Sequence, residues 1–177
     1  MTKIDLSLEN NTHLLEQKDQ SQEMFRGNFL NLHRDTVKMP NGSLATRDYF
    51  AHPGAAVISA LTANNELVLE KQFRYPVGQV LLEFPAGKLD PKETDLDCAK
   101  RELLEETGLV AEEWTELMQL HLSNSVSDEL AIIYLARKLH QGEAEPEETE
   151  QLVVRKIPFD EMVKMVDEGI ITDSMTV

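Results

Sequence analysis

The sequence predicts a mixed α/β fold in which helices pack on a largely antiparallel sheet. Three observations support this class: short apolar runs recur along the chain, turn-forming residues separate them, and two segments alone show the period of an amphipathic helix. The 177 residues, 41% of them hydrophobic, suffice for one or two small domains. We expect a polar tail over 1–22, an N-terminal antiparallel β region over 23–52 and a main domain over 53–177.

The first half of the chain consists of hairpin-like pairs of strands. Asn41-Gly42 stands between two strand-like runs, and Asn-Gly is a strong signal for a two-residue hairpin turn. His52-Pro53-Gly54 marks a break before the next hairpin, and Pro85-Ala86-Gly87 stops the last strand. Five strands are expected here, over 35–38, 44–50, 55–61, 66–72 and 80–84.

A helix is expected between Thr94 and Gly108. Thr94 with Asp97 three residues later resembles a capping box, and Gly108 is a typical residue after a helix end. Leu96, Ala99 and Leu103 fall on one face of this helix. The rest of the chain predicts strands over 115–121, 130–138 and 152–157, an acidic loop over 143–150 and a closing helix over 159–168.

Charge and composition exclude several classes of partner. The formal net charge is -15, and we find no basic stripe, so a nucleic-acid partner is not expected. No apolar stretch approaches the roughly 18 residues of a membrane span, and the N-terminus has no secretory signal pattern. Cys98 is the single cysteine, which excludes an internal disulfide. We therefore expect a cytoplasmic protein without a membrane partner.

Three glutamates on the predicted helix are candidates for a metal site. Glu102, Glu105 and Glu106 lie within an arc of about 100°, and Glu102 and Glu106 are neighbours at i and i+4. Like charges at this spacing destabilise a helix unless they are neutralised, which hard divalent cations do well. When the three glutamates are considered alone, an ordinary solvated face, with Arg101 paired to Glu105, is the more common explanation.

The wider spacing decides between these alternatives. Gly87, Glu93, Arg101-Glu102, Glu105-Glu106 and Gly108, followed by an apolar residue, match the Nudix box at every specified position. A chance match per start site is on the order of 10⁻⁹ from average residue usage. The chain thus resembles the Nudix family, which implies a loop–helix–loop metal site on an α/β/α sandwich.

Motifs outside the box resemble the ADP-ribose pyrophosphatase branch of that family. They are Gln72-Phe73-Arg74-Tyr75-Pro76-Val77, Leu82-Glu83-Phe84-Pro85-Ala86-Gly87, His52-Pro53-Gly54, Ser127-Asp128-Glu129 and the segment 168–174. This resemblance implies Mg²⁺-dependent hydrolysis of nucleoside diphosphate sugars to a nucleoside monophosphate and a sugar phosphate. Ser123-Asn124-Ser125 departs from the Ser-Pro-Gly of that branch, so GDP-mannose and other nucleotide sugars join ADP-ribose as expected substrates.

The resemblance also assigns metal ligands and catalytic residues. Glu102 and Glu106 are the principal ligands of Mg²⁺, with Mn²⁺ as an alternative ion, and Glu105 and the carbonyl of Ala86 supplement them. Arg101 holds the neighbouring carboxylates through a forked pair that lysine cannot form. A glutamate on a later loop assists the attacking water, and the candidates are Glu150 first and Glu148 second.

Substrate-binding residues are implied at several other positions. Arg74 matches a position that contacts the diphosphate, Arg47 is a weaker candidate of the same kind, and Glu83 matches a position that binds substrate or metal. Phe25 and Tyr49 offer rings that would stack on a base, although such aromatic residues are more often ordinary members of a β-sheet core.

The resemblance further implies a homodimer in which strands from residues 23–52 exchange between subunits. Two other functions stay open. One is a Nudix enzyme that removes oxidised nucleoside triphosphates, which the N-terminal β region disfavours. The other is a non-catalytic sensor of nucleotide sugars, for which a degraded box would be typical. The box is intact in this sequence.

Overall fold

The structure is a computed structural model that describes residues 11–142 and 151–177. The chain divides into two compact units, and each is described by itself. The N-terminal unit runs to His52 and includes Ser123–Asp128. The main unit comprises Pro53–Leu122 and Glu129–Val177. In the described part of the chain, neither α-helix has the length and apolar character needed to cross a membrane.

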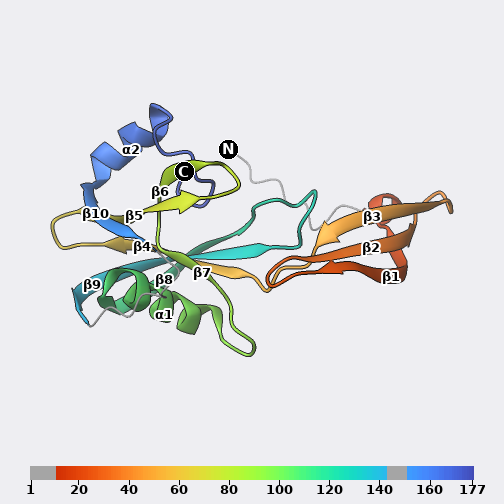
Figure 1. Cartoon of the computed structure of the whole chain (residues 1–177), viewed down its shortest axis with the longest axis horizontal. Coiled ribbons are helices and arrows are strands. Elements are labelled where there is room, and N and C mark those ends of the chain that lie inside the picture. The colour runs from red at the N-terminus through yellow and green to blue at the C-terminus, as the bar shows by residue number, and fades with distance from the viewer. Residues whose placement is uncertain (1–10, 143–150) are drawn as a thin grey trace. The chain divides into compact units, whose positions relative to one another are not determined.

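The N-terminal unit is a three-stranded antiparallel sheet in the order β1-β2-β3 (Figure 1). Its elements are a short 3-10 helix, Thr12–Leu14, and the strands β1 (Gln17–Arg26), β2 (Asn31–Lys38) and β3 (Leu44–Phe50). The expected turn joins β2 to β3, and Gly42 in it has φ +83°, which favours glycine. The loop Ser123–Asp128 joins this unit through a hydrogen bond from the Phe50 amide to the Val126 carbonyl.

Strand β1 begins earlier than the sequence predicts. The polar tail was expected over 1–22, but Gln17 already pairs with Lys38 of β2. All ten residues of β1 are exposed. Its backbone hydrogen bonds to β2 hold this strand in place. Because neither of its faces is buried, its sequence need not alternate between apolar and polar residues, and that alternation is what predicts a half-buried strand.

The main unit contains one mixed sheet in the order β10-β5-β4-β9-β8, with β6 added on β5 and β7 added on β4. Strands β4 and β9 are parallel, and the other pairs are antiparallel. The strands are β4 (Ala55–Leu61), β5 (Glu66–Arg74), β6 (Gln79–Glu83), β7 (Ala86–Lys88), β8 (Leu109–His121), β9 (Leu130–Gln141) and β10 (Val153–Pro158).

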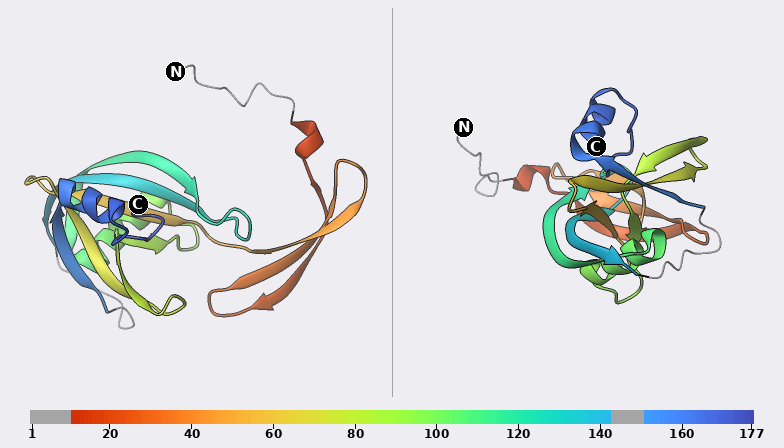
Figure 2. Two further views of the ribbon diagram at one scale, coloured as in Figure 1. Left: turned by 90° about the horizontal axis from the view of Figure 1, so that it is seen from above. Right: turned by 90° about the vertical axis from the view of Figure 1, so that its left-hand side faces the viewer.

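Two apolar cores lie on opposite faces of this sheet, because side chains alternate along each strand. Val57 and Leu69 belong to the core that includes Met162 of α2 (Phe159–Asp167). Ile58 and Val68 face the other way, into the core beneath α1 (Asp95–Thr107). The helices cover the two faces (Figure 1 and Figure 2). The predicted α/β/α sandwich is confirmed.

Helix α1 has the ends that its sequence predicts. The Thr94 hydroxyl accepts a hydrogen bond from the Asp97 amide at 3.2 Å, which caps the first turn. Gly108 ends the helix with φ +68° and donates its amide to the Leu104 carbonyl. The short strand β7 was not predicted, because Pro85-Ala86-Gly87 reads as a strand stop.

Candidate active site

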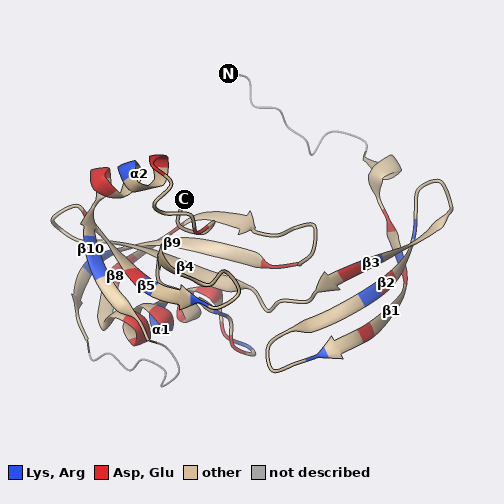
Figure 3. Ribbon diagram, turned by 45° about the horizontal axis from the view of Figure 1, so that its top comes forward, with Lys and Arg blue, Asp and Glu red and all other residues tan. Residues whose placement is uncertain are grey.

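Two of the three glutamates on α1 are buried at the margin of the core. Glu102 is 9% exposed and Glu106 is 8% exposed, whereas Glu105 is partly exposed. The burial follows from the position of Leu103, which is 0% exposed and places its helical neighbours against the sheet. Acidic residues predominate among the charged residues of α1 (Figure 3). Buried carboxylates of like charge require positive charge or N–H donors beside them.

The backbone of β7 supplies part of that compensation. The Ala86 amide donates a hydrogen bond to the Glu106 carboxylate at 3.1 Å. A Cβ atom on Gly87 would lie 1.7 Å from Oε1 of Glu102, so only glycine lets this carboxylate come so close to the strand. The two glutamates and the first residues of β7 therefore meet at one place.

Arg101 pairs with three carboxylates of the acidic cluster and offsets part of their charge. Its Nε and Nη2 atoms donate to the two carboxylate oxygens of Glu93 at 2.9 and 3.0 Å. Its Nη1 atom donates to Glu102 at 2.7 Å and to Glu105 at 2.9 Å. Hydrogen bonding to Arg101 lowers the pKa of Glu93 to about 2. Contact with three carboxylates needs the guanidinium fork, which a lysine ammonium lacks.

Glu93 fixes the loop that precedes α1. Besides its forked pair with Arg101, it accepts a hydrogen bond from the Asp90 amide at 3.0 Å. Arg101 also donates to the Lys88 carbonyl at 3.2 Å. Together these contacts tie the loop from β7 to α1 onto the helix, so they keep the backbone near Ala86 against the glutamates.

The donor set fits a hard divalent cation. It consists of carboxylate and carbonyl oxygens alone, which Mg²⁺ prefers over nitrogen or sulfur ligands. Within residues 11–142 and 151–177, no group of three or more His, Cys, Asp or Glu side chains is placed so that these side chains could hold a metal ion. An incomplete set is what Mg²⁺ commonly uses, because it keeps several waters and takes further oxygens from substrate phosphates.

A second arginine–carboxylate pair lies on β5 and β6. Glu83 is 1% exposed, and Arg74 donates to its carboxylate from Nε at 3.1 Å and from Nη2 at 2.6 Å. The hydrogen bond to Glu83 raises the pKa of Arg74. The Arg74 side chain is 39% exposed, so the guanidinium links a buried carboxylate to solvent.

The remaining predicted site residues lie in the N-terminal unit or outside the described residues. Arg47, Phe25 and Tyr49 belong to the N-terminal unit, so a role for them at α1 stays a prediction. There Arg47 pairs with Glu16 at 2.5 Å, Phe25 is 54% exposed, and the Tyr49 ring stacks on His33 with centroids 5.7 Å apart. Glu148 and Glu150 lie outside the described residues.

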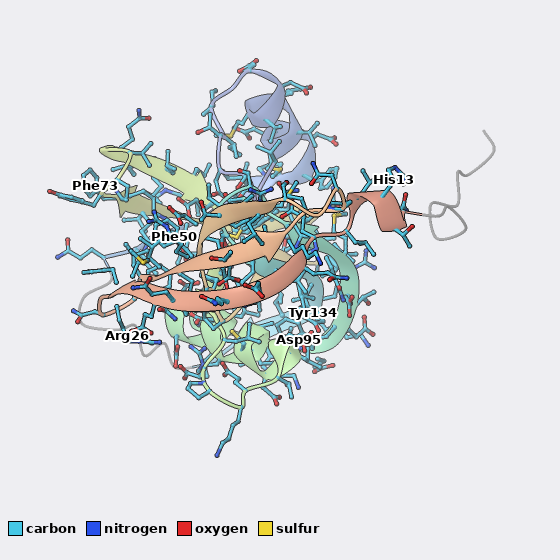
Figure 4. All side chains as sticks on the ribbon, turned by 90° about the vertical axis from the view of Figure 1, so that its right-hand side faces the viewer. His13, Arg26, Phe50, Phe73, Asp95 and Tyr134 are labelled. Atoms are coloured by element: carbon cyan, nitrogen blue, oxygen red, sulfur yellow. The ribbon has the colours of Figure 1, made fainter. Side chains whose placement is uncertain are left out.

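Two further side chains, those of Cys98 and Tyr134, make contacts near α1 that were not foreseen. The Cys98 thiol lies 3.4 Å from the Lys88 carbonyl and 3.6 Å from the Gly87 carbonyl, and burial raises its pKa to about 12. A thiol with such a pKa is a poor nucleophile. The Tyr134 hydroxyl on β9 donates to Asp95 at 2.6 Å, which fixes the start of α1 on the sheet (Figure 4).

Comparison with known proteins gives the family. The model described as NUDIX domain matches residues 51–172, and the nucleoside diphosphate sugar hydrolase N-terminal domain matches residues 16–50. The chain belongs to the Nudix family, and it is a hydrolase. It carries the N-terminal domain of nucleoside diphosphate sugar hydrolases ahead of the Nudix domain, which agrees with the branch motifs in the sequence.

Individual relatives extend over nearly the whole chain. An ADP-ribose pyrophosphatase of Bacillus subtilis is 33% identical over 165 residues, which cover 92% of this chain and 89% of that protein. A methanol dehydrogenase activator of Bacillus methanolicus is 35% identical over 167 residues, covering 93% and 90%. The crystal structure of an ADP compounds hydrolase matches with a TM-score of 0.76 at 21% identity, covering 87% of this chain and 84% of that one, and shows the same fold.

Proposed function

We propose that this protein hydrolyses the pyrophosphate bond of ADP-ribose and of related nucleoside diphosphate sugars in the presence of Mg²⁺. The products are a nucleoside monophosphate and a sugar phosphate. The observation that carries the proposal is the meeting of Glu102 and Glu106 with the backbone of Ala86 and Gly87, inside an intact Nudix box. The similarity to an ADP-ribose pyrophosphatase favours ADP-ribose as the first substrate to test.

In this proposal Glu102 and Glu106 hold the metal, with Glu105 and the Ala86 carbonyl as further ligands. Nudix hydrolases need a divalent ion, and such an ion supplies charge neutralisation for the diphosphate and a lower pKa for a bound water. Mn²⁺ serves as an alternative ion. Arg101 keeps Glu102 and Glu105 in place through the contacts at 2.7 and 2.9 Å.

In this proposal, arginine and carboxylate side chains of the chain make or support the contacts with the substrate. Arg74 binds the diphosphate while Glu83 fixes its guanidinium, because the forked pair leaves the arginine partly exposed. We assign the glutamate that assists the attacking water to Glu150 or Glu148, on the basis of the family resemblance alone. Phe25, Tyr49 and Arg47 are proposed to contact the nucleotide from the N-terminal unit.

The protein is proposed to be a homodimer, and the exposure of the N-terminal sheet supports this. Among the described residues of that unit, Asp35 and Val37 alone are buried. A small sheet needs an apolar face packed against something to be stable. Met24 and Phe25 of β1 are 42% and 54% exposed, and a second copy would cover them. Light scattering should give twice the mass of one chain, and a fully active monomer would contradict the dimer.

The test of the activity is product analysis with Mg²⁺ and a panel of nucleotides. The panel contains ADP-ribose, GDP-mannose, other nucleotide sugars and nucleoside triphosphates. Glu106→Gln keeps the size of the side chain but removes its charge, and we expect it to lower kcat/KM by more than about 100-fold, since residues that merely orient metal ligands already cost 10- to 100-fold. Glu112→Gln, on the exposed part of β8, is the matched control and should leave the rate unchanged.

The panel also separates the alternatives. Nucleoside monophosphate and sugar phosphate as products, lost in Glu106→Gln, would support the proposal, and the relative rates would show whether Ser123-Asn124-Ser125 broadens the choice of sugar. Turnover of triphosphates alone would favour a nucleotide-sanitising enzyme. Binding of nucleotide sugars without turnover would favour a sensor. We also propose a cytoplasmic location, with the single free cysteine, Cys98, as its support.

A further inference from the structure

The last residues of the chain form a hydrogen-bonded turn on the main unit. The amides of Thr176 and Val177 both donate to the Asp173 carbonyl, at 3.2 and 3.1 Å. The Asp173 carboxylate accepts from the Met175 amide at 3.1 Å and from the Thr176 hydroxyl at 2.8 Å. Ile171 just before the turn is 2% exposed and belongs to the core under α2. The turn is therefore anchored in the core by Ile171, and the hydrogen bonds to Asp173 fix its conformation.

Thr176 connects this turn to a segment 92 residues earlier. The Phe84 amide donates to the Thr176 hydroxyl at 2.9 Å. Both residues are buried, Thr176 at 3% exposure and Phe84 at 8%. Because the hydroxyl donates its own hydrogen to Asp173, its lone pairs are directed at the Phe84 amide. This contact satisfies a buried N–H group that would otherwise be costly.

The contact lies at the centre of the segment that carries the proposed ligands. Glu83 is held by Arg74, the Pro85 carbonyl accepts from the Ile58 amide at 2.8 Å, and the Ala86 amide donates to Glu106. Phe84 is the residue between these fixed points, and its amide bond to Thr176 completes the set. Every residue from Glu83 to Ala86 thus has a hydrogen bond to a different part of the main unit.

We propose that the turn Asp173–Thr176 positions the backbone of residues 83–86, and that Thr176 is a positioning residue of the active site. Without the hydroxyl, the buried Phe84 amide would move towards another acceptor. Glu83 and the Ala86 carbonyl would move with it, because Glu83 directly precedes Phe84 and Ala86 follows it by two residues. The inference rests on the proposed roles of Glu83 and Ala86.

Asp173 gives the turn a second connection to the same place. Its charge contributes to the raised pKa of Arg74, although Glu83 contributes more. The carboxylate that orients the Thr176 hydroxyl therefore also acts electrostatically on the arginine that holds Glu83. A change at this turn should consequently affect the metal ligands and the diphosphate contact together.

The test compares Thr176→Val, Thr176→Ser and the control Thr172→Val in the whole 177-residue chain. Valine keeps the shape of threonine without the hydroxyl, serine keeps the hydroxyl, and Thr172 is an exposed residue of the same segment. We measure Mn²⁺ affinity of the substrate-free protein by electron paramagnetic resonance, together with kcat, KM and Tm. Thr176→Val should weaken Mn²⁺ binding and lower kcat, each by about 10-fold, as residues that orient metal ligands do. Thr176→Ser and Thr172→Val should match wild type.

A lower Tm in Thr176→Val with unchanged Mn²⁺ affinity and unchanged kcat would overturn the proposal, since it would leave the residue a stabilising role only. If Thr176→Val does not fold, Asp173→Asn replaces it, and the same comparison decides. Mn²⁺ affinity also separates this inference from the proposed function. Weaker Mn²⁺ binding in a protein that cleaves no substrate of the panel would support the positioning role while the activity fails.

Discussion

The two units of this molecule are stabilised in different ways. In the main unit one sheet carries apolar side chains on both faces, and α1 and α2 cover them. In the N-terminal unit the described residues bury Asp35 and Val37 alone, and β1 is exposed along its whole length. The main unit thus has the cores of an independent domain, whereas the N-terminal sheet depends chiefly on its backbone ladder. This difference is the basis of the proposed dimer, since a small sheet needs a packed apolar face to be stable.

Ion pairs show the same contrast. Arg101 binds Glu93 and Glu102 with carboxylate side chains 14% and 12% exposed. Arg34 binds Asp48 across β2 and β3 at a similar distance of 2.6 Å, but both side chains are 47% exposed. Exposed pairs contribute little because water screens them, while partly buried groups are costly when unpaired. Ion pairs of similar geometry therefore contribute differently to stability in the two units.

The main unit also has exposed apolar side chains, and Phe73 in Figure 4 is one of them. Phe73 on β5 and Val80 opposite it on β6 are 55% and 61% exposed, and Tyr75 in the connecting turn is 86% exposed. This hairpin carries Arg74 on its inner side, paired with Glu83. The main unit is thus well packed around α1 but not at this hairpin, so the contrast between the units applies to their cores.

The largest expected effect concerns the apolar core of the main unit. Leu103→Ala removes a side chain that is 0% exposed beneath α1, and it should lower the free energy of unfolding by about 2–5 kcal/mol. Phe25→Ala in β1 removes a side chain that is 54% exposed, so in a single copy its effect should stay within about 0.5 kcal/mol. Denaturant unfolding of both variants at several protein concentrations measures the difference.

The dependence of stability on protein concentration tests this comparison. Leu103→Ala should lose stability equally at all concentrations. Phe25→Ala should lose stability only at concentrations where the proposed dimer forms, because only there would Phe25 be covered. A loss of several kcal/mol in Phe25→Ala that does not depend on concentration would show that the N-terminal sheet has a core of its own.

The elements that the sequence predicted well are those whose pattern reflects local physics. The strand expected over 55–61 agrees in both ends with β4, and α1 begins and ends at the capping residues Thr94 and Gly108. Strand β1 was assigned partly to a tail, because backbone pairing without burial leaves no apolar alternation. Strand β7 was missed because a strand of three residues is recognisable only by its partner β4.

In the candidate site, too, some features could be predicted from the sequence and others could not. The acidic face of α1 follows from i, i+4 spacing, and the requirement for glycine at position 87 is explained by the close approach of Glu102. The contact between Phe84 and Thr176 could not be predicted, since it joins positions 92 residues apart through a single hydroxyl. Helical periodicity constrains neighbours within a turn, whereas a contact of this kind depends on how the whole sandwich closes.

A smaller effect is expected from the pH dependence of the partly buried pair of Glu93 and Arg101. Arg101 lowers the pKa of Glu93 from 4.5 to about 2, so the carboxylate is charged in the folded protein at pH values where it would be protonated in the unfolded chain. Its contribution is complete above pH 4.5 and is lost as the pH falls towards 2. The difference between these two pKa values corresponds to at most about 3 kcal/mol. Glu93→Gln removes this contribution, so its Tm should lie below that of wild type at pH 6 and approach it at pH 3.

Asp48→Asn is the matched control in the N-terminal unit. Hydrogen bonding to Arg34 also lowers the pKa of Asp48, but that pair is exposed, so 1 M salt should remove most of the difference between Asp48→Asn and wild type. Glu93→Gln should keep most of its deficit in the same salt, since a partly buried pair is screened less. Equal sensitivity to salt in the two variants would mean that the cluster around Arg101 is as solvated as the surface pair, and the metal site would then lack the preformed support that its burial implies.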